Sequence, residues 1–393
     1  MNDVFLVQPT RTAIGKFQGA LADISAVELG RCVVQQSLQR AELEPAAVDE
    51  VIMGNVLGAG LGQNVARQIA IKAYVPNEKT AFSVNMVCSS GLKAVLLAAQ
   101  AIKCGDADIV VAGGTENMTA APYLLNKARS GYRLGNGEMV DSLVNDGLLD
   151  VFNNIHMGVT AENLAQKYNI TRQQQDEFAV ASQNKTEAAI AAGKFADEIV
   201  PVSVPQRKGQ PLMFDQDEFP RKDTTLEGIA KLPPAFKKEG TVTAANSSGI
   251  NDGAACMIVA SSEAVRKYSL KPVARLVSYA CHGTDPAIMG IGPVQAVKAC
   301  LRKAGWSLSD VQLIESNEAF AAQALAVSME LKWNNDIVNV NGGAIALGHP
   351  IGASGARILV TLLHEMQRRK ATNGLATLCA GGGMGVAACV ELI

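Results

Sequence analysis

The sequence has little net charge, few metal-binding side chains and no long apolar run. Among its 393 residues, 35 basic and 37 acidic side chains leave a formal net charge of −2, so the total charge predicts binding to neither nucleic acid nor a membrane surface. The eight cysteines form no Cys-x-x-Cys pair and the four histidines show no ligand spacing, which argues against a zinc site. No apolar segment approaches the roughly 18 residues expected of a membrane-spanning helix.

The two ends of the chain carry no recognisable targeting segment. A strand-like run, Val4–Val7, begins almost at once and leaves no room for a signal or transit sequence. The last residues, Glu391-Leu392-Ile393, differ from the Ser-Lys-Leu peroxisomal address. Free thiols are the default state of cysteine in a reducing compartment. We therefore expect a cytoplasmic protein.

Apolar residues and glycine dominate the composition. Hydrophobic residues make up 48% of the chain and there are 36 glycines, which is typical of a tightly packed α/β protein and argues against disorder. The length allows two or three domains. In the first 120 residues, strand-like runs at 4–7, 48–56 and 109–112 alternate with helical patterns at 26–41 and 63–73. This alternation predicts a largely parallel sheet covered on both faces. Ser25 is the expected N-cap of the first helix, with Glu28 completing a capping box.

One short stretch, Ser83–Leu92, combines a strand, a cysteine and a helix. An apolar alternating run from about Thr80 is typical of a buried strand, and apolar residues from Leu92 to Ile102 recur at helical spacing. Cys88 therefore lies at or near a helix N-terminus, where free amides and the helix dipole favour the nucleophilic thiolate. The alternative is a small buried hydrophobe, as most free cysteines are, and the stretch alone does not decide between them.

The segment 121–248 has a different composition. Residues 123–140 are rich in Gly, Asn, Arg and Lys, 158–192 are mostly helical with Thr171 as an N-cap, and 201–234 are polar and interrupted by prolines. We interpret this segment as an inserted loop domain, the usual place for substrate contacts. The regular α/β pattern resumes with a predicted strand at 254–260.

The last third of the chain repeats the first. The matching pairs are Leu313–Asn317 with Val51–Asn55, Val340-Asn341 and Ser354–Arg357 with Val84-Asn85 and Ser90–Lys93, and Leu378–Gly382 with Val111–Gly114. This self-similarity indicates a duplicated unit; the alternative is a chance similarity between two Gly-rich α/β segments. Two similar halves would place Cys88 and the matching loops of the second half around a shared interface, a favoured position for a ligand site.

Three polar positions in the second half could supply chemistry. His349 lies in a predicted loop, 346–355, where a histidine is less often a core residue than on an apolar helix face. Cys379 ends a strand and precedes three glycines, whose amides can approach a ligand closely. Asn317 follows a strand-like run at 313–315. Each could instead have a purely structural role: His349 as a hydrogen-bonded core histidine, Cys379 as a packed core residue and Asn317 as an ordinary loop residue.

Seven segments together carry a resemblance to a known family. They are Asn85–Gly91, Gly113–Met118, His156–Gly158, Asn246–Ala254, Asn317–Phe320, Gly348–Gly355 and Cys379–Gly385. In this order they resemble the thiolase family, over nearly the whole chain. The resemblance implies an α/β fold of duplicated βαβαβαββ halves that form a five-layer α/β/α/β/α core, with an inserted loop domain.

The resemblance also implies how the chain is divided. Residues 1–120 would form the N-terminal thiolase half, completed by about 249–271. Residues 121–248 would form the loop domain, used for CoA binding and oligomerisation, and residues 272–393 the C-terminal half. The usual assembly in the family is a homotetramer, a dimer of dimers.

By the same resemblance, Cys88 is the acyl-carrying nucleophile, and His349 activates its thiol and later holds the thioester oxygen of the second substrate. Cys379 is the acid/base that takes a proton from the acetyl methyl group, or from the CoA thiol in the thiolytic direction. Asn317 fixes a water that forms an oxyanion hole with His349, and the amides of Cys88 and Gly381 form a second hole. Such donors matter because the α-proton of a thioester is weakly acidic; losing one typically costs about 10²–10³ in rate.

Further residues occupy positions where the family contacts the substrate. They are His156, Met157, Arg221, Ser248, Met289, Ala319 and Phe320. Ser248 would meet the pantetheine amide and Arg221 the adenine end of CoA. Met289 resembles the short-chain, biosynthetic branch, which implies acetyl-CoA C-acetyltransferase activity: two acetyl-CoA give acetoacetyl-CoA and CoA, reversibly. The expected partners are these CoA thioesters, with no tightly bound cofactor, no nucleic acid and no membrane.

Other functions remain as alternatives. Within the family, the alternative is a 3-ketoacyl-CoA thiolase of broader range, from fatty-acid breakdown. Ketoacyl synthases share the duplicated core but lack the second catalytic cysteine, so Cys379 distinguishes them. A nucleotide-binding oxidoreductase would need Gly-x-Gly-x-x-Gly between a strand and a helix, and Gly58–Gly62 lacks that spacing. A non-catalytic acyl or lipid carrier would have no need of the four catalytic positions together.

Overall fold

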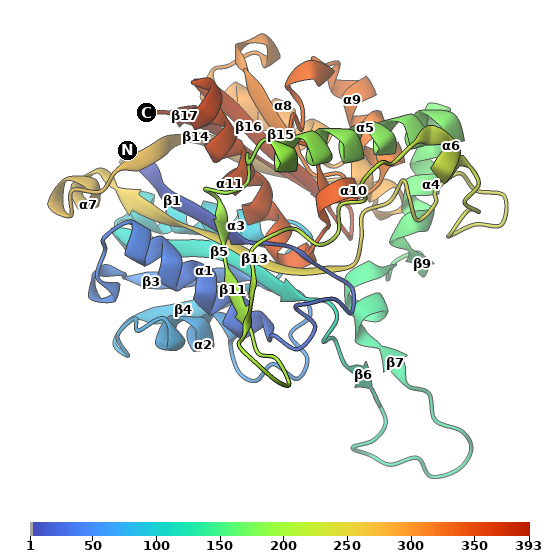
Figure 1. The fold of residues 1–393 in the computed structure, drawn as a ribbon, viewed down its shortest axis with the longest axis horizontal. Helices are drawn as coiled ribbons and strands as arrows, with labels where there is room; N and C mark the ends of the chain where they lie inside the picture. The colour runs from blue at the N-terminus through green and yellow to red at the C-terminus, as the bar shows by residue number, and fades with distance from the viewer. Residues whose placement is uncertain (1–2) are drawn as a thin grey trace.

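A computed structural model describes residues 3–393 (Figure 1). Its main feature is an 11-stranded sheet with the principal order β15-β16-β17-β14-β1-β13-β5-β3-β4. These strands are β1 (Val4–Thr12), β3 (Glu50–Gly54), β4 (Thr80–Val84), β5 (Ile109–Asn117), β13 (Asn251–Ser261), β14 (Pro272–Gly283), β15 (Leu313–Ser316), β16 (Asn373–Ala380) and β17 (Met384–Leu392). Two short strands, β2 (Gly15–Lys16) and β10 (Ile199–Val200), pair with β13 and β1.

The sheet contains one arrangement twice. In the N-terminal half, β3 is parallel to β4 and β5, β5 is antiparallel to β13, and β13 is antiparallel to β1. In the C-terminal half, β15 is parallel to β16, and its residue Ile314 also forms a single parallel β-bridge with Val338. β16 is antiparallel to β17, and β17 is antiparallel to β14. The matching strands β1 and β14 pair with each other and join the halves. The predicted duplication is confirmed, although β4 has only a single bridge as its counterpart.

Helices cover the sheet in layers. They are α1 (Ala26–Arg40), α2 (Val65–Lys72), α3 (Ser90–Cys104), α8 (Pro293–Ala304), α9 (Ala321–Leu331) and α11 (Ile351–Arg369). α3 and α11 pack against each other in the centre, α1 and α2 cover the outer face of the N-terminal half, and α8 and α9 cover that of the C-terminal half (Figure 1). The five predicted layers, α/β/α/β/α, are therefore present.

Alternate residues of the central strands face different layers. In β3, Val51 and Met53 pack with the outer helices, and Ile52 faces the central layer. In β13, Cys256 faces outward and Met257 inward. Both faces of these strands are buried, which explains why they are nearly continuous apolar runs in the sequence.

The two central helices cross at matching glycines. A Cβ on Gly91 would lie 2.8 Å from the amide nitrogen of Ala356, and one on Gly355 would lie 2.4 Å from the amide nitrogen of Leu92. Only residues without a side chain allow this approach. The predicted loop at 346–355 is therefore wrong at both ends: one helix ends at Leu347 and α11 begins at Ile351, because the glycines serve a helix contact, so only 348–350 are non-helical.

The strand before Cys88 is at the edge of the sheet. β4 pairs with β3 on one side, and it is the last strand in the sheet order. Thr80, Phe82 and Ser83 are exposed in the single chain, Phe82 by 38%. The prediction of a buried strand is therefore wrong here, since an alternating apolar run does not distinguish a central strand from an edge.

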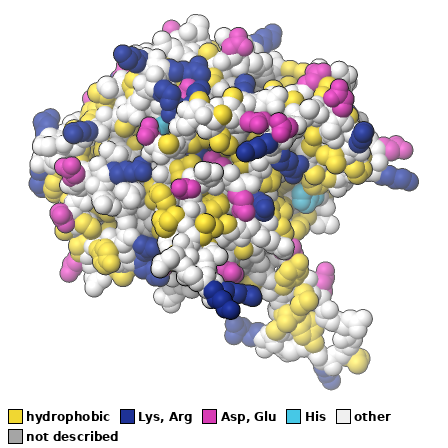
Figure 2. All heavy atoms as spheres, in the orientation of Figure 1, with side chains coloured by type: hydrophobic (Ala, Val, Ile, Leu, Met, Phe, Trp, Pro, Cys, Tyr) yellow, Lys and Arg dark blue, Asp and Glu magenta, His cyan; other side chains and the backbone are white. Residues whose placement is uncertain are grey.

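Residues 121–248 lie beside the main sheet, apart from β10. Their elements are β6 (Tyr123–Leu124), β7 (Val140–Asp141), β8 (Leu149–Asp150), β9 (Ile155–His156), α4 (Met157–Tyr168), α5 (Arg172–Ala191), β11 (Val202–Val204), β12 (Leu212–Phe214) and α6 (Leu226–Ala230). Residues 122–142, here called the arm, project from the body (Figure 1), and Figure 2 shows hydrophobic side chains along it. Tyr123, Leu134 and Met139 are among its exposed residues.

Short helical segments complete the fold. They are η1 (Pro45–Ala47), η2 (Leu143–Leu148), α7 (Ser262–Lys267), η3 (Pro286–Ile291), η4 (Leu308–Asp310), η5 (Asn335–Ile337) and α10 (Ala344–Leu347). α10 and α11 flank the residues 348–350, so His349 lies in a three-residue connection between two helices. This connection fixes the direction in which the histidine enters the site.

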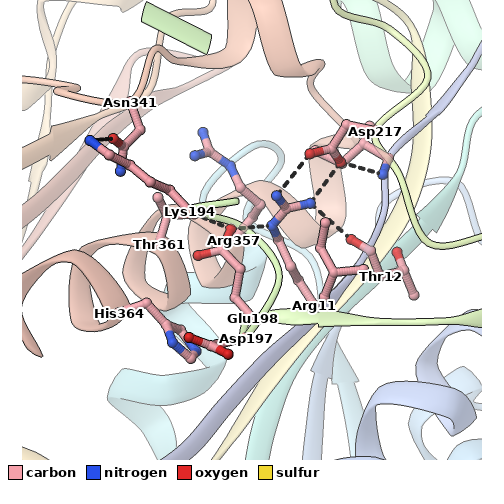
Figure 3. Close-up of polar contacts among 12 residues, drawn as sticks. Arg11, Thr12, Lys194, Asp197, Glu198, Asp217, Asn341, Arg357, Thr361 and His364 are labelled. Carbon is pink, nitrogen blue, oxygen red and sulfur yellow. Dashed lines mark hydrogen bonds and ion pairs between the residues drawn. The ribbon is translucent and has the colours of Figure 1, made fainter. Parts of the chain in front are cut away.

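A buried arginine ties the inserted segment to both halves. Arg11 on β1 donates from Nε to Glu198 at 2.6 Å and from its two terminal nitrogens to Asp217 at 2.7 and 2.9 Å (Figure 3). Thr361 on α11 donates to the same Glu198 at 3.1 Å. Burial lowers the pKa of Arg11, but the charges of Asp217 and Glu198 outweigh it and raise that pKa. Removing one partner would leave a buried charge uncompensated, so this group holds the segment firmly.

Two of the predicted helix caps behave differently. Ser25 accepts a hydrogen bond from the Glu28 amide at 3.2 Å, which confirms it as the N-cap of α1. The capping box is wrong, because the Glu28 carboxylate pairs with Arg31 and Lys72 instead. Thr171 is confirmed as the N-cap of α5, in a capping box with its third helical residue.

One stretch could cross a membrane by length and composition alone. The window Val87–Cys104 has a mean hydropathy of 1.3, so the prediction that no apolar run is long enough is wrong. Its position explains its composition: 61% of the window is buried, and α3 lies between the sheets against α11. A helix buried on all sides of a large core is apolar all round.

Candidate active site

Cys88 lies in a strained turn between β4 and α3. Val87 has a φ of 49°, in the left-handed region that β-branched residues rarely adopt. Asn85 Oδ1 accepts from the Val87 amide at 2.9 Å, while Ser90 Oγ accepts from the Met86 amide at 2.8 Å and donates to the Val87 carbonyl at 2.7 Å. The motif therefore supplies its own bonds to hold the strained backbone, and strain of this kind gathers at functional sites.

The Cys88 thiol is almost completely buried. Burial raises its pKa to about 11, although hydrogen bonds from the amides of Gly381 and of Cys88 itself lower it, and the charge of Glu116 raises it further. The expectation that the helix N-terminus leaves a thiolate is therefore wrong for the free protein, because desolvation outweighs the amides. A base is needed to make this sulfur nucleophilic.

His349 is buried and its ring is held on both sides. Its Nδ1 lies 2.6 Å from Ser354 Oγ, which donates its own hydrogen to the Pro350 carbonyl at 2.8 Å. Because that hydroxyl has one hydrogen, we assign the ring proton to Nδ1 and the free lone pair to Nε2. Burial, with the charge of Arg357, lowers the pKa of His349 to about 3. The ring is neutral and can accept a proton at Nε2.

Asn317 faces that lone pair. Its Nδ2 lies 3.5 Å from His349 Nε2, and its backbone amide donates to the Thr377 carbonyl at 3.0 Å. Its Oδ1 is buried with no partner among the described residues. An unpaired buried oxygen of this kind is suited to a bound water, as the family resemblance implies.

Cys379 comes from the C-terminal half and lies close to Cys88. It is fully buried near the end of β16, and burial followed by the charge of Cys88 raises its pKa. Two residues later, the Gly381 amide hydrogen-bonds to the Cys88 thiol. A Cβ on Gly381 would lie 3.3 Å from Val87 and 3.5 Å from Met157. The structure thus groups Cys88 with Cys379 and Gly381, and His349 with Asn317, whose amide bonds to Thr377 two residues before Cys379.

Most of the predicted substrate contacts gather beside Cys379. Met157, Met289, Ala319, Phe320 and Cys379 belong to one buried hydrophobic cluster. The Ser248 amide donates to the Ala319 carbonyl at 3.0 Å, which places it next to this cluster.

The remaining two predicted contacts lie at the edge of this cluster or apart from it. The half-buried His156 stacks on Phe236 with ring centroids 4.8 Å apart. Arg221 is exposed, its guanidinium lies 5.7 Å from the Phe219 ring, and its backbone bonds to Gln183. A cavity of about 580 Å³ is lined by Arg221 but by none of the other predicted contacts.

Sequence reasoning missed four residues of the site. Phe236 stacks on His156, meets Phe320 edge to face with centroids 6.0 Å apart, and leaves no room for a Cβ on Gly158. Ser354, Asn251 and Glu116 bond to His349 or to its loop. Three of the four lie inside the recognised motifs, but nothing in the sequence said which residue they would reach.

Comparison with known proteins gives the family. The family models "Thiolase, N-terminal domain" and "Thiolase, C-terminal domain" match residues 4–263 and 270–392. The chain is 60% identical to the acetyl-CoA acetyltransferase of Pseudomonas aeruginosa over 98% of each chain, and 60% identical to that of Cupriavidus necator over 100% of each.

Comparison with solved structures leads to the same family. The acetyl-CoA acetyltransferase of Bacillus anthracis matches with a TM-score of 0.98 and 46% identity, and the human mitochondrial 3-ketoacyl-CoA thiolase matches with a TM-score of 0.97 and 43% identity. Each alignment covers 100% of this chain and 99% of the other. The chain therefore belongs to the thiolase family.

Proposed function

We propose that this protein is an acetyl-CoA C-acetyltransferase, which condenses two acetyl-CoA to acetoacetyl-CoA and CoA, reversibly. One observation carries the proposal: two buried cysteines, one from each half, share a site in which an amide two residues after Cys379 bonds to the Cys88 sulfur. Acetyl transfer needs a sulfur to carry the acyl group, and condensation needs a second group to remove a proton from the acetyl methyl.

In the first step, His349 Nε2 takes the thiol proton as Cys88 attacks the thioester carbonyl of acetyl-CoA. The Cys88–acetyl bond forms, the bond to CoA sulfur breaks, and Cys379 gives its proton to the departing CoA thiolate, while His349 keeps the proton from Cys88. The amides of Cys88 and Gly381 would hold the oxyanion of the tetrahedral intermediate, a role that their hydrogen bonds to the Cys88 sulfur support.

In the second step, Cys379 takes a proton from the methyl group of a second acetyl-CoA. The enolate oxygen lies against His349 and a water on Asn317, and the new carbanion attacks acetyl-Cys88. The carbon–carbon bond forms, the bond to Cys88 breaks, and the proton on His349 returns to the Cys88 sulfur, which leaves Cys379 protonated again. The proposal needs the Asn317 Oδ1 to be free for that water, and it has no protein partner among residues 3–393.

The apolar cluster beside Cys379 is suited to the pantetheine arm. Phe236 and His156 would line it, Ser248 would meet its amide, and Arg221 would lie at the adenine end. CoA thioesters enter as substrates, and we propose that no cofactor is tightly bound.

A broader 3-ketoacyl-CoA thiolase is the second candidate, since the human mitochondrial 3-ketoacyl-CoA thiolase has nearly the same fold. Met289, 2% exposed in the cluster, favours a short acyl pocket. Thiolysis rates should decide: we expect acetoacetyl-CoA to be cleaved at least about tenfold faster than 3-ketodecanoyl-CoA. Replacing Met289 by Ala should narrow that ratio. Equal rates with both substrates would favour the second candidate, and no thiolysis of either would contradict the proposed function.

We further propose that residues 121–248 form the CoA-binding and oligomerisation part, between halves 1–120 (with 249–271) and 272–393. The exposed edge of β4 and the apolar arm support a homotetramer, a dimer of dimers, because both offer surfaces that a partner would cover. The eight free cysteines support a cytoplasmic location. Light scattering on the purified protein tests the assembly; a monomer would contradict it.

A further inference from the structure

Two side chains of the N-terminal half hold the loop that carries His349. Asn251, the first residue of β13, accepts a hydrogen bond from the His349 amide at 2.9 Å. Glu116, near the end of β5, accepts one from the Gly352 amide at 2.9 Å. Both side chains are fully buried. The two bonds fix the backbone just at, and just after, the position from which the imidazole projects.

Glu116 also holds the chain on its other side. Its carboxylate accepts from Asn55 Nδ2 at 2.9 Å and from the amides of Val56 and Leu57 at 3.0 and 3.1 Å. Together with the Gly352 bond, this set of donors joins the loop after β3 to the first turn of α11. Burial raises the pKa of Glu116 to about 7, while these amide donors lower it and so favour the ionised form, whose several hydrogen bonds fix a geometry.

The backbone is closely packed where the N-terminal half meets the first turn of α11 and the His349 connection. A Cβ on Gly54 would lie 2.7 Å from the Gly352 carbonyl oxygen, and one on Gly114 would lie 2.0 Å from it. A Cβ on Gly348 would lie 2.5 Å from the Asn251 side chain. The His349 loop therefore rests directly on the N-terminal half, and a shift of its two anchors would move the histidine relative to Cys88.

We propose that Glu116 and Asn251 are positioning residues for the transfer reaction: across the two halves, they hold His349 in reach of Cys88. The proposal rests on the proposed function, because it gives His349 a part in the chemistry. Neither side chain hydrogen-bonds to Cys88 or Cys379: Asn251 bonds to the His349 amide and Glu116 to the Gly352 amide, while the charge of Glu116 also raises the pKa of Cys88. Reacting groups must be held closely, and a misplacement of about 1 Å can cost 10²-fold in rate.

The first test is Glu116→Gln, whose NH₂ group cannot accept from the surrounding amides. We expect the kcat for acetoacetyl-CoA thiolysis to fall about 10²-fold and KM to stay within about threefold. Asp49→Asn is the matched control: Asp49 accepts from the Asp108 and Ile109 amides at 2.9 and 3.0 Å, at the opposite end of β3 and β5. We expect its kcat within about twofold of wild type. Equal losses in the two variants would overturn the proposal.

A double-mutant cycle separates positioning from general damage. Adding Glu116→Gln to His349→Ala should cost less than about twofold more, because the residue that Glu116 positions is already gone. A full multiplicative loss would overturn the proposal. If circular dichroism shows Glu116→Gln unfolded, Asn251→Ala takes its place in the same cycle.

The reactivity of Cys88 can be measured without turnover, so it tests the positioning role separately from the proposed function. The rate of Cys88 alkylation by iodoacetamide, followed by mass spectrometry against pH, should change in Asn251→Ala, which removes no charge, in the same way as in His349→Ala. An unchanged profile in Asn251→Ala beside a changed one in His349→Ala would overturn the positioning role. If the wild-type protein does not cleave acetoacetyl-CoA, the proposed function fails, and this profile still decides the positioning role.

Discussion

The two halves present matching strand ends that differ in how their asparagines are used. Asn55 follows β3, and its Nδ2 donates to the Thr115 carbonyl at 3.2 Å and to Glu116 at 2.9 Å. Asn317 follows β15, and its Nδ2 reaches only His349, at 3.5 Å, while its Oδ1 is buried without a partner among the described residues. The same position is thus structurally satisfied in one half and open in the other. In a duplicated fold, the unsatisfied copy marks the side that does chemistry.

The largest expected effect comes from replacing Cys379, the catalytic cysteine that the C-terminal half contributes. In Cys379→Ala, acetyl transfer to Cys88 should persist, because Cys88 and His349 remain and solvent can protonate the departing CoA thiolate, while thiolysis and condensation should fall by about 10²–10⁴. Intact-mass measurement after mixing with acetyl-CoA detects the acetyl group, and steady-state rates detect the loss. Unchanged turnover would remove Cys379 from the mechanism.

An intermediate effect tests the asparagines directly. Asn317→Ala should lower kcat by about 10²–10³, because it removes the support of an oxyanion hole, with little change in stability. Asn55→Ala should lower the free energy of unfolding by about 1–3 kcal/mol, because it leaves buried partners unpaired, and should lower kcat less than Asn317→Ala does, because three backbone amides still hold Glu116. Thermal unfolding and kinetics on both variants check this. If both variants lost activity equally, the proposed difference in role between Asn317 and Asn55 would be wrong.

The smallest expected effect concerns the pKa of Cys88, which burial raises and hydrogen bonds from backbone amides lower. Its pKa is raised to about 11, so the reactive thiolate is scarce at neutral pH and increases as pH rises. The alkylation rate of Cys88 should therefore climb about tenfold per pH unit between pH 7 and pH 10. Peptide mapping must distinguish it from the exposed Cys104 and Cys281. A plateau reached below pH 9 would mean that the amides outweigh burial.

The sequence predicted much of the fold from local patterns. Apolar periodicity located the central strands and helices, and the repeat predicted two halves, because each half uses the same buried faces. The recognised motifs included Cys88 and His349. The predictions that failed have a common cause: the exposed β4 edge, the helical start at Ile351 and the Glu116–Gly352 bond all depend on which distant segments of the chain lie beside them. Local patterns do not record such contacts.

The pairing of β1 has a consequence for how the chain is made. β1 (Val4–Thr12) is synthesised long before the strands to which it hydrogen-bonds, β13 (Asn251–Ser261) and β14 (Pro272–Gly283). At a ribosomal rate of about 5–20 residues per second, its neighbours emerge roughly 12–50 s later. During that interval an apolar strand has both edges open. The N-terminal half cannot close as an independent unit, and its first strand must be kept from strands of other nascent chains until the middle of the protein has been completed.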